Sequence, residues 1–585
     1  MGQTGKPSRM RTYCCRATGM RVLALVAGLV CLAVFVLGCS SSPREHFLKI
    51  GLPEEPRSLN IWLGTDANSN KILSQIYQPL YLRHPHTLKL IPWLAGEAPV
   101  IDETRTVYTV KLRPAKWSDG SDFTARDVIF TRKLFLDFKL PRYYSKWKIV
   151  KKLEALDDHT LVFHLKAPSA IFMSRVLTAP MVSEKEWGPI AKEALKADKP
   201  LRALQDYPVE NPLGTGPFYL EQYKKGAFLH MKKNPYFFGK GKKIGGHVLG
   251  PYVDNLLFQI YGTSDVAILA LQKGDIDYYW WDIQPGYIND LKTKAGVCLY
   301  FNKKSALYYL GFNLRRPPFD NKAFRQAVAT LIDKEFILTR ILQNYGTPMN
   351  SIIPSGNHFW HNPQVKRYGE GMTRNGRLKA AADMLAAAGY TWEVPPVNVE
   401  GEIVPPSNIH LPSGEAMPDI VILTPPADYD PKRAFAGTMI QEWLRELGIP
   451  ASARPMAFNA LLDTVKGKRD FDAFVLGYGK LNLDPDYLRA FFHSKNDKPR
   501  GWNMSGYQNP EFDRLSDLQR GTIDMDKRRE MIWEMQAMVM EDLPYFPLYN
   551  PHIIEATLKE RFVGWVEKVD GIGNIWSMCM VKPVN

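Results

Sequence analysis

The residues whose types and spacing could support chemistry are few. His84 and His86 stand two positions apart, and His358 and His361 three, so each pair could offer two imidazole ligands to one metal ion. Two ligands do not complete a metal site, and we expect each pair to lie in an ordinary loop. The sequence has no Gly-x-Ser-x-Gly, His-Glu-x-x-His or phosphate-binding-loop motif. We therefore expect no catalytic centre, no metal and no cofactor, and we do not interpret the chain as an enzyme.

The stretch best suited to contacting a ligand is residues 476–486, LGYGKLNLDPD. Tyr478 stands between two glycines, and an aromatic ring with a hydroxyl offers a large contact area and one polar group. Trp502, with Asn503 beside it, is the second candidate. Asp484 could bind a cationic group of a ligand, and Asp486 and Asp66 are alternatives for that role. The alternatives are core packing for the aromatic residues and turn capping beside the following proline for Asp484.

The elements around that stretch alternate between strand and helix. Residues 418–426 and 471–479 are apolar runs typical of buried strands, whereas residues 434–450 have helical spacing and are stopped at Gly448. This alternation predicts an α/β domain, in which ligands bind beyond the carboxyl ends of the strands. Tyr478 would then lie at such a strand end.

The first half of the chain is richer in strands. Residues 108–114 and 159–168 alternate apolar and polar side chains, and residues 211–239 indicate two strands bounded by turns. Further on, residues 319–342 predict one helix, and the Pro- and Ser-rich residues 392–418 predict a long surface hairpin. We expect this 585-residue chain to form about three or four compact units.

The N-terminus indicates export. Arginines precede an apolar run over residues 22–37, which is short for a membrane span and typical of a secretory signal. The ending VLGC resembles a bacterial lipobox, which predicts lipidation of Cys39 after removal of residues 1–38. An uncleaved anchor helix is the alternative, and the start codon is either Met1 or Met20. Every reading places the rest of the chain outside the cytoplasm.

The distribution of charge argues against a nucleic-acid partner, whereas the cysteine content leaves the pairing of two residues open. The formal net charge of +15 is not concentrated in a Lys/Arg block interleaved with aromatic residues, so we expect no nucleic-acid partner. After the signal and Cys39, only Cys298 and Cys579 remain. These two residues form either a disulfide in an oxidising compartment or two separate thiols.

Segments spread over nearly the whole chain carry a resemblance to a known family. They are LAGEAPVIDETRTVYTVKLRPAKWSDGSDFTARDVIFT, ALDDHTLVFHLKAP, GTGPFYLEQYKKG, KNPYFF, ALQKGDIDY, FNLRRPPFDNKAFRQAVATLIDKE, AAAGY and GYQNPEFDRL. In this order they resemble family 5 of the extracellular solute-binding proteins, the oligopeptide-, dipeptide- and nickel-binding lipoproteins of ABC importers.

The resemblance implies an α/β, periplasmic-binding-protein-like fold. Two lobes would close around a cleft, with a smaller domain inserted in the N-terminal lobe. The expected parts are lobe I (45–80, 205–295 and 545–585), the inserted domain (81–204) and lobe II (296–544).

The resemblance also implies a function. The protein would be a monomeric, lipid-anchored carrier that captures a peptide or another small solute and delivers it to ABC permease and ATPase subunits. An extracytoplasmic ligand sensor is the alternative. In peptide-binding members, an aspartate near the Gly–aromatic pair binds the peptide ammonium, whereas here Leu481 occupies that position. We therefore expect Tyr478, Trp502, Asn503, Asp484 and Leu481 to line the site, and the solute stays open.

Overall fold

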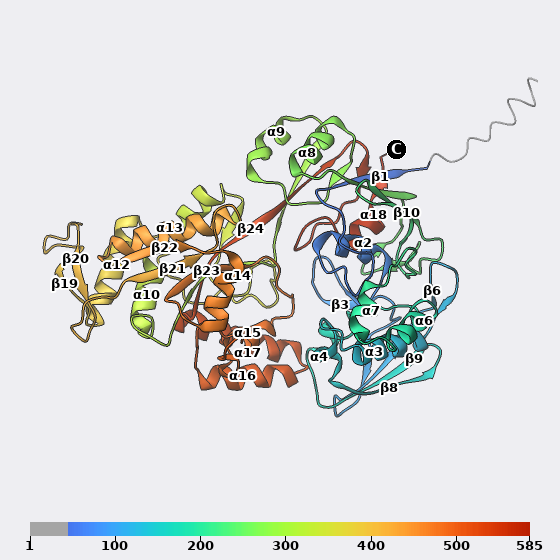
Figure 1. Cartoon of the computed structure of the whole chain (residues 1–585), viewed down its shortest axis with the longest axis horizontal. Helices are drawn as coiled ribbons and strands as arrows, with labels where there is room; N and C mark the ends of the chain where they lie inside the picture. The colour runs from blue at the N-terminus through green and yellow to red at the C-terminus, as the bar shows by residue number, and fades with distance from the viewer. Residues whose placement is uncertain (1–44, 585) are drawn as a thin grey trace, which may run out of the picture. The chain divides into compact units, whose positions relative to one another are not determined.

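The computed structural model describes residues 45–584, so the apolar segment and Cys39 lie outside the described residues. The largest element is a 12-stranded mixed sheet (Figure 1). Its order is β10 (Phe218–Lys224), β11 (Phe228–Lys233), β14 (Asn255–Ile260), β1 (Phe47–Leu52), β15 (Tyr278–Tyr279), β24 (Tyr545–Leu558), β17 (Leu307–Phe312), β23 (Ala473–Tyr478), β21 (Ile420–Thr424) and β22 (Ala451–Pro455), while β16 (Val297–Lys303) and β18 (Gly346–Pro348) also pair with β24.

Strand β24 connects the two sides of this sheet. Its first residues pair with β17, and its last residues pair with β15 and β16. Figure 1 shows it as one long ribbon between the strands around β23 and those around β1. Strand β24 therefore belongs to both sides of the sheet.

Two large hydrophobic cores lie on either side of β24. The first core uses residues from 48–280 together with residues from 562–581, and the second uses residues from 307–549. A small third core packs α8 (Ser264–Lys273) and α9 (Ile288–Thr293) against the end of β24. The chain therefore leaves the first core, builds the second and returns.

Within the first core, a four-stranded antiparallel sheet stands apart from the large one. Its order is β4 (Val100–Ile101), β5 (Val107–Lys111), β9 (Thr160–Leu165) and β8 (Val150–Asp157). Helix α3 (Ala125–Asp137) packs on β8 and on α6 (Glu184–Ala194). Short helices complete this part: α4 (Tyr144–Trp147), α5 (Phe172–Arg175) and α7 (Pro200–Asp206).

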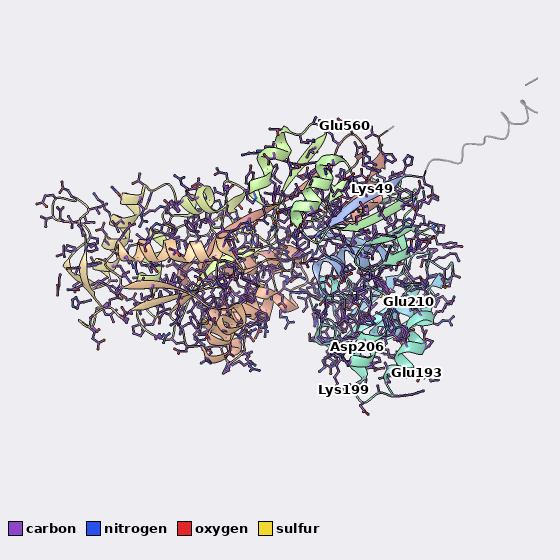
Figure 2. The ribbon with its side chains drawn as sticks, turned by 45° about the horizontal axis from the view of Figure 1, so that its top comes forward. Lys49, Glu193, Lys199, Asp206, Glu210 and Glu560 are labelled. Atoms are coloured by element: carbon purple, nitrogen blue, oxygen red, sulfur yellow. The ribbon has the colours of Figure 1, made fainter. Side chains whose placement is uncertain are left out.

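Other elements of the first core frame these sheets. Helix α2 (Ala67–Ile76) begins at Asp66, whose carboxylate accepts the Ser69 backbone N–H at 2.8 Å. Figure 2 labels Glu193, Lys199 and Asp206, charged residues on or beside α6 and α7 that are all exposed. The remaining short elements are β2 (Tyr81–Arg83), β3 (Leu90–Pro92), β6 (Ala115–Lys116), β7 (Asp122–Phe123), β12 (Lys243–Ile244), β13 (His247–Val248), β25 (Phe562–Val563), β26 (Lys582–Pro583), α18 (Ile575–Met580) and a 3-10 turn (Pro285–Tyr287).

The second core has the predicted α/β alternation. Helix α13 (Pro431–Arg445) follows β21 and packs on β21, β22 and β23, and α10 (Lys322–Leu331) packs on α12 (Arg374–Ala387). The parallel pairs β21–β22 and β21–β23 place their carboxyl ends at one edge. Beyond that edge lie α14 (Phe458–Leu462), α15 (Tyr487–Phe492), α16 (Pro510–Gly521), α17 (Met525–Asp542) and a 3-10 turn (Ser494–Asn496).

Most sequence-predicted elements are present, and one prediction is wrong. The expected surface hairpin at 392–418 is the pair β19 (Thr391–Val394) and β20 (Ser407–His410). The single helix expected over 319–342 is instead broken after Leu331. Asp333 caps a new turn by accepting the Phe336 N–H, which starts α11 (Lys334–Phe336) and a π-helical turn (Ile337–Ile341). A capping aspartate competes with helix continuation at that point.

The described part of the chain has no helix that is both long and apolar enough to cross a membrane. Cys298 is half-buried and Cys579 is buried, and both are free thiols, so the structure has the second of the two alternatives for this pair.

Candidate functional site

Side chains from the two large cores meet in a buried polar contact formed by Ser174, Asp484 and Arg528. The Arg528 guanidinium donates two hydrogen bonds of 2.9 Å to the Asp484 carboxylate, which also accepts the Ser174 hydroxyl at 2.7 Å. Arg528 is 0% exposed and Asp484 3%. Ser174 lies on α5 beside the first core, whereas the other two belong to the second. We call this arrangement the buried latch.

Electrostatics explain why this carboxylate remains charged. Burial alone would raise the pKa of Asp484, but the Arg528 charge and its hydrogen bonds outweigh burial and hold the pKa well below its usual range. The Asp484 carboxylate also accepts the Asp486 backbone N–H at 3.1 Å, which is the turn-capping role that the sequence suggested. Asp484 is thus already paired and capped, and it does not offer a free carboxylate.

A cavity of about 410 Å³ opens beside the buried latch, and we call it the interface cavity. Arg83, Met173 and Ser174 line it from the first-core side. Its other wall contains Phe359, Trp360, Asp484 and Arg528 from the second-core side, with Arg528 lying 4.9 Å from the Trp360 ring centroid. Its volume is in the range of small-molecule sites, and its lining combines aromatic and charged groups.

Tyr478 ends β23 within a stack of aromatic rings. Its ring lies parallel to Tyr309 at 5.8 Å and to Phe491 at 4.6 Å. Trp502 lies 6.4 Å away and is 48% exposed, and the Lys466 ammonium is 3.4 Å from its ring centroid. The stack therefore has a half-buried centre at Tyr478 and an open end at Trp502.

The glycine before Tyr478 has a packing role. A Cβ on Gly477 would lie 2.4 Å from the Tyr308 ring, so only glycine lets the neighbouring strand approach this closely. Leu481 is 7% exposed, and its backbone N–H donates to the Ser305 carbonyl at 2.5 Å. Leu481 therefore packs in the second core.

Asn503 organises a loop. It is 1% exposed, its amide NH₂ donates to the Tyr507 carbonyl at 2.9 Å, and its carbonyl accepts the Gly506 and Tyr507 backbone N–H groups at 3.0 Å. These bonds engage both ends of the amide. We therefore do not assign Asn503 to the ligand site, although Trp502 next to it points outward.

Two buried charges that the sequence did not suggest lie near β24. The Lys71 ammonium of α2 donates to the Trp280 carbonyl and lies 4.1 Å from the Trp281 ring centroid. Burial lowers the pKa of Lys71 to about 7, although the charge of Glu555 opposes that shift. Burial likewise raises the pKa of Glu555 to about 7. The two residues are far apart along the chain, so no local sequence signal could have linked them.

The histidines do not assemble a metal centre. His84, His86 and His247 have ring centroids about 6 Å apart. However, Nδ1 of His84 accepts the His86 and Thr87 backbone N–H groups, and its Nε2 lies 3.1 Å from the Gly245 carbonyl. Across residues 45–584, no group of three or more His, Cys, Asp or Glu side chains could hold a metal ion.

Known structures share this fold. An oligopeptide-binding protein of an oligopeptide ABC transporter from Thermotoga maritima superposes with a TM-score of 0.74 at 21% identity, over 93% of this chain and 100% of that one. Such neighbours confirm the expected α/β, periplasmic-binding-protein-like fold with two lobes.

Sequence comparisons extend over almost the whole chain. The oligopeptide-binding protein AppA of Bacillus subtilis is 26% identical, covering 91% of this chain and 93% of that protein. The dipeptide-binding protein of Escherichia coli is 23% identical, covering 92% and 94%. The profile of the family described as bacterial extracellular solute-binding proteins, family 5 Middle, matches residues 89–499. The chain therefore belongs to family 5 of the bacterial extracellular solute-binding proteins.

Proposed function

We propose that this protein captures a small solute between its two lobes and delivers it to an ABC importer. The observation that carries the proposal is the interface cavity, whose walls come from both cores. A solute in that space would contact both lobes only while they are together, so it would stabilise the closed form. Family 5 consists of substrate-binding transport proteins, and we infer that this chain has no enzymatic activity of its own.

The aromatic stack is the proposed platform for the solute. Tyr478 and Trp502 lie near the carboxyl end of β23, where ligands bind in α/β sheets, but neither residue lines the interface cavity. We therefore propose the stack as a second contact for the solute, with Trp502 as its exposed end. Leu481 would support the platform from within the core, and Asp484 would line the interface cavity as part of the latch rather than as a free anion. Related proteins are named for binding oligopeptides and dipeptides, which makes a peptide one candidate solute here.

Anchoring and domain limits belong to the same proposal. Lipidation at Cys39 would hold a monomer at the outer face of the cell membrane, within reach of permease and ATPase subunits. The proposed lobe II (296–544) is supported by the extent of the second core, from Leu307 to Tyr549. The proposed lobe I and the inserted domain (81–204) share the first core, so their division rests on the family resemblance.

A ligand panel tests this function. Peptides of two to nine residues, sugars and metal chelates are added singly while thermal unfolding is followed. A ligand that binds only the folded protein adds about 2.7 kcal/mol of stability at a hundredfold excess over Kd, and Tm rises accordingly. We expect at least one class to raise Tm in a saturable way. A flat response to the whole panel would count against solute capture.

A further inference from the structure

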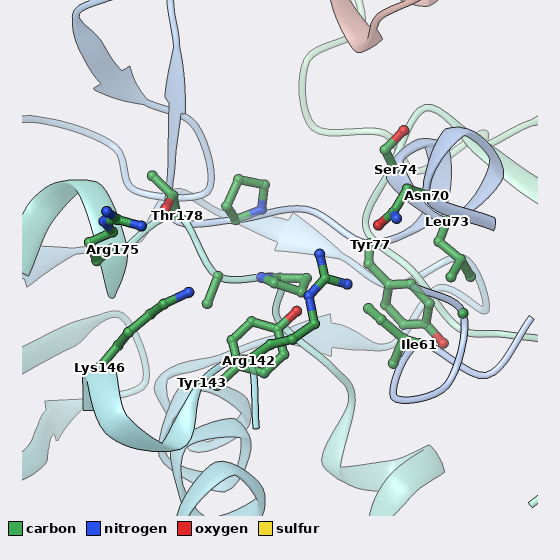
Figure 3. Close-up of a pocket in the computed structure, with 14 residues that line it drawn as sticks. Ile61, Asn70, Leu73, Ser74, Tyr77, Arg142, Tyr143, Lys146, Arg175 and Thr178 are labelled. Carbon is green, nitrogen blue, oxygen red and sulfur yellow. The ribbon is translucent and has the colours of Figure 1, made fainter. Parts of the chain in front are cut away.

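A second cavity, of about 280 Å³, lies entirely on the first-core side, and we call it the cationic pocket. Helix α2, α4 and the segment after α5 form its walls. Figure 3 shows Arg142, Lys146 and Arg175 with their charged ends turned toward the same space. The uncharged lining comes from Ser74, Tyr77 and other residues between 61 and 180.

The three cations of this pocket have no counter-charge within its lining, although Asp484 attracts Arg175 from outside the pocket. The lining contains no aspartate or glutamate. Among the described residues, the side chains of Arg142, Lys146 and Arg175 form no ion pair and no hydrogen bond, whereas basic side chains such as Lys185 and Arg202 in the same part of the fold do pair with acids. Arg142 is exposed, whereas Lys146 and Arg175 are half-buried. Like charges that are partly removed from water repel one another, so an anion between them would lower the free energy of the pocket.

The lowered pKa of Lys146 is consistent with repulsion among the three cations. Burial, then Arg175 and Arg142, lower the pKa of Lys146 to about 8. A bound anion would oppose the two electrostatic contributions and return the ammonium to its fully charged form. The pocket is therefore better suited to an anion than to water alone.

The cationic pocket also adjoins the buried latch. Arg175 follows Ser174 directly in α5, and its charge acts on the pKa values of Asp484 and Tyr487 across the interface. An anionic group held by Arg175 would thus lie at the edge of the space between the cores. A solute could place its body in the interface cavity and its anionic end here.

We propose that Arg142, Lys146 and Arg175 bind an oxyanion, which in the working protein is a carboxylate or phosphate end of the captured solute. The claim that the oxyanion is one end of the captured solute rests on the proposed function. The claim that the three cations bind an oxyanion does not, because every residue lining the cationic pocket lies between 61 and 180. An inorganic anion therefore needs no lobe closure to reach the pocket.

Calorimetric titration with sulfate tests the site itself, since the charge of sulfate stays constant from neutral to alkaline pH. We expect saturable binding, weakened about tenfold in Arg142→Gln and in Arg175→Gln, because each removes a charge-assisted bond. Arg57→Gln and Lys199→Met are matched controls, since both residues are exposed and lie outside the pocket, and these variants should bind as the wild type does. Absence of saturable binding, or equal binding by Arg142→Gln, would overturn the proposal.

A pH series separates binding from mere structural damage. Sulfate affinity should fall as pH rises through about 8, where Lys146 loses its proton, because the pKa of Lys146 is lowered to about that value. Lys146→Met should remove that dependence. A pH dependence that persists in Lys146→Met would overturn the assignment of Lys146. Phosphate and acetate titrations at one pH then show whether the pocket prefers a phosphate or a carboxylate end.

The two proposals can fail separately. If sulfate binds as expected but no organic solute raises Tm, the anion site stands and the transport function falls. If an organic solute binds equally well in wild type and Arg142→Gln, and sulfate does not bind, the transport function stands and the anion site is wrong.

Discussion

Two neighbouring residues of α5 face opposite electrostatic situations. Ser174 completes the buried latch, in which Arg528 and Asp484 neutralise each other. Arg175 belongs to the cationic pocket, whose lining contains no acidic side chain. The latch is buried and satisfied within the protein, whereas the cations of the pocket are exposed (Arg142) or half-buried (Lys146 and Arg175), so an anion from solution can reach all three. The latch is therefore structural, and the pocket is proposed to be functional.

Breaking the latch should give the largest effect. Arg528→Met leaves the Asp484 carboxylate buried and unpaired, which should lower the free energy of unfolding by about 3–5 kcal/mol. Urea unfolding measures this loss of unfolding free energy. The double variant with Asp484→Asn removes both charges and should recover most of the loss. A single variant within about 0.5 kcal/mol of wild type would show that the latch is not structural.

Glu555 and Lys71 extend the comparison, because the buried Glu555 carboxyl and the half-buried Lys71 ammonium have opposite charges and no direct salt bridge. Since the pKa of Glu555 is raised from 4.5 to about 7, the folded state holds an extra proton between these values. This contribution to stability is complete below about pH 4.5 and is lost as pH rises to about 7. Glu555→Gln should remove about 3 kcal/mol of pH-dependent change over that window.

Urea unfolding at a series of pH values measures this change. Lys71 acts in the opposite direction: its pKa is lowered from 10.5 to about 7, so its contribution is present above about pH 10.5 and is lost as pH falls to about 7. These two contributions are thus both smallest near neutral pH. An identical pH profile in wild type and Glu555→Gln would contradict the burial argument.

Substitution of Tyr478 tests whether the aromatic stack, unlike the latch, contributes to solute affinity. Tyr478→Ala removes a ring stacked on Tyr309 and Phe491 and should weaken binding of the co-purified solute by about tenfold, or about 1.4 kcal/mol. Tyr478→Phe keeps the ring and should retain most of the affinity. Calorimetry compares the variants, and equal affinity for Tyr478→Ala and wild type would remove this residue from the site.

Ser174→Ala is the mildest change. It removes one hydrogen bond between the cores but leaves the Arg528–Asp484 pair intact, so lobe closure should become less favourable by about 1 kcal/mol. Small-angle scattering should show a larger radius of gyration without solute, while Tm changes little. The control is Ser174→Thr, which keeps the hydroxyl. Unchanged scattering in Ser174→Ala would mean that the hydroxyl does not hold the lobes together.

Local patterns predicted the frame of the site. The strand at 471–479 and the helix at 434–450 follow from apolar spacing, and they place Tyr478 at a strand end as expected. The break near Asp333 was not predicted, because apolar residues keep their helical spacing on both sides of it. The hydrogen bond by which Asp333 caps a new turn leaves no mark in that spacing.

Features that depend on distant pairing could not be predicted. The sequence could not show that Asp484 is paired, because its partner Arg528 is 44 positions away. Asn503 was predicted to contact a ligand, because its bonds to Gly506 and Tyr507 form only once the loop has folded and leave no mark in the sequence. The cationic pocket gathers Arg142, Lys146 and Arg175 only after the chain has folded.

Native mass spectrometry of freshly purified protein tests the central claim most directly. We expect a species heavier than the polypeptide by the mass of one small solute, which is lost on denaturation. We also expect Tyr478→Ala to carry less of it. A bare polypeptide mass from cells grown on a rich medium, with no gain on incubation with the ligand panel, would contradict capture of a solute between the two lobes.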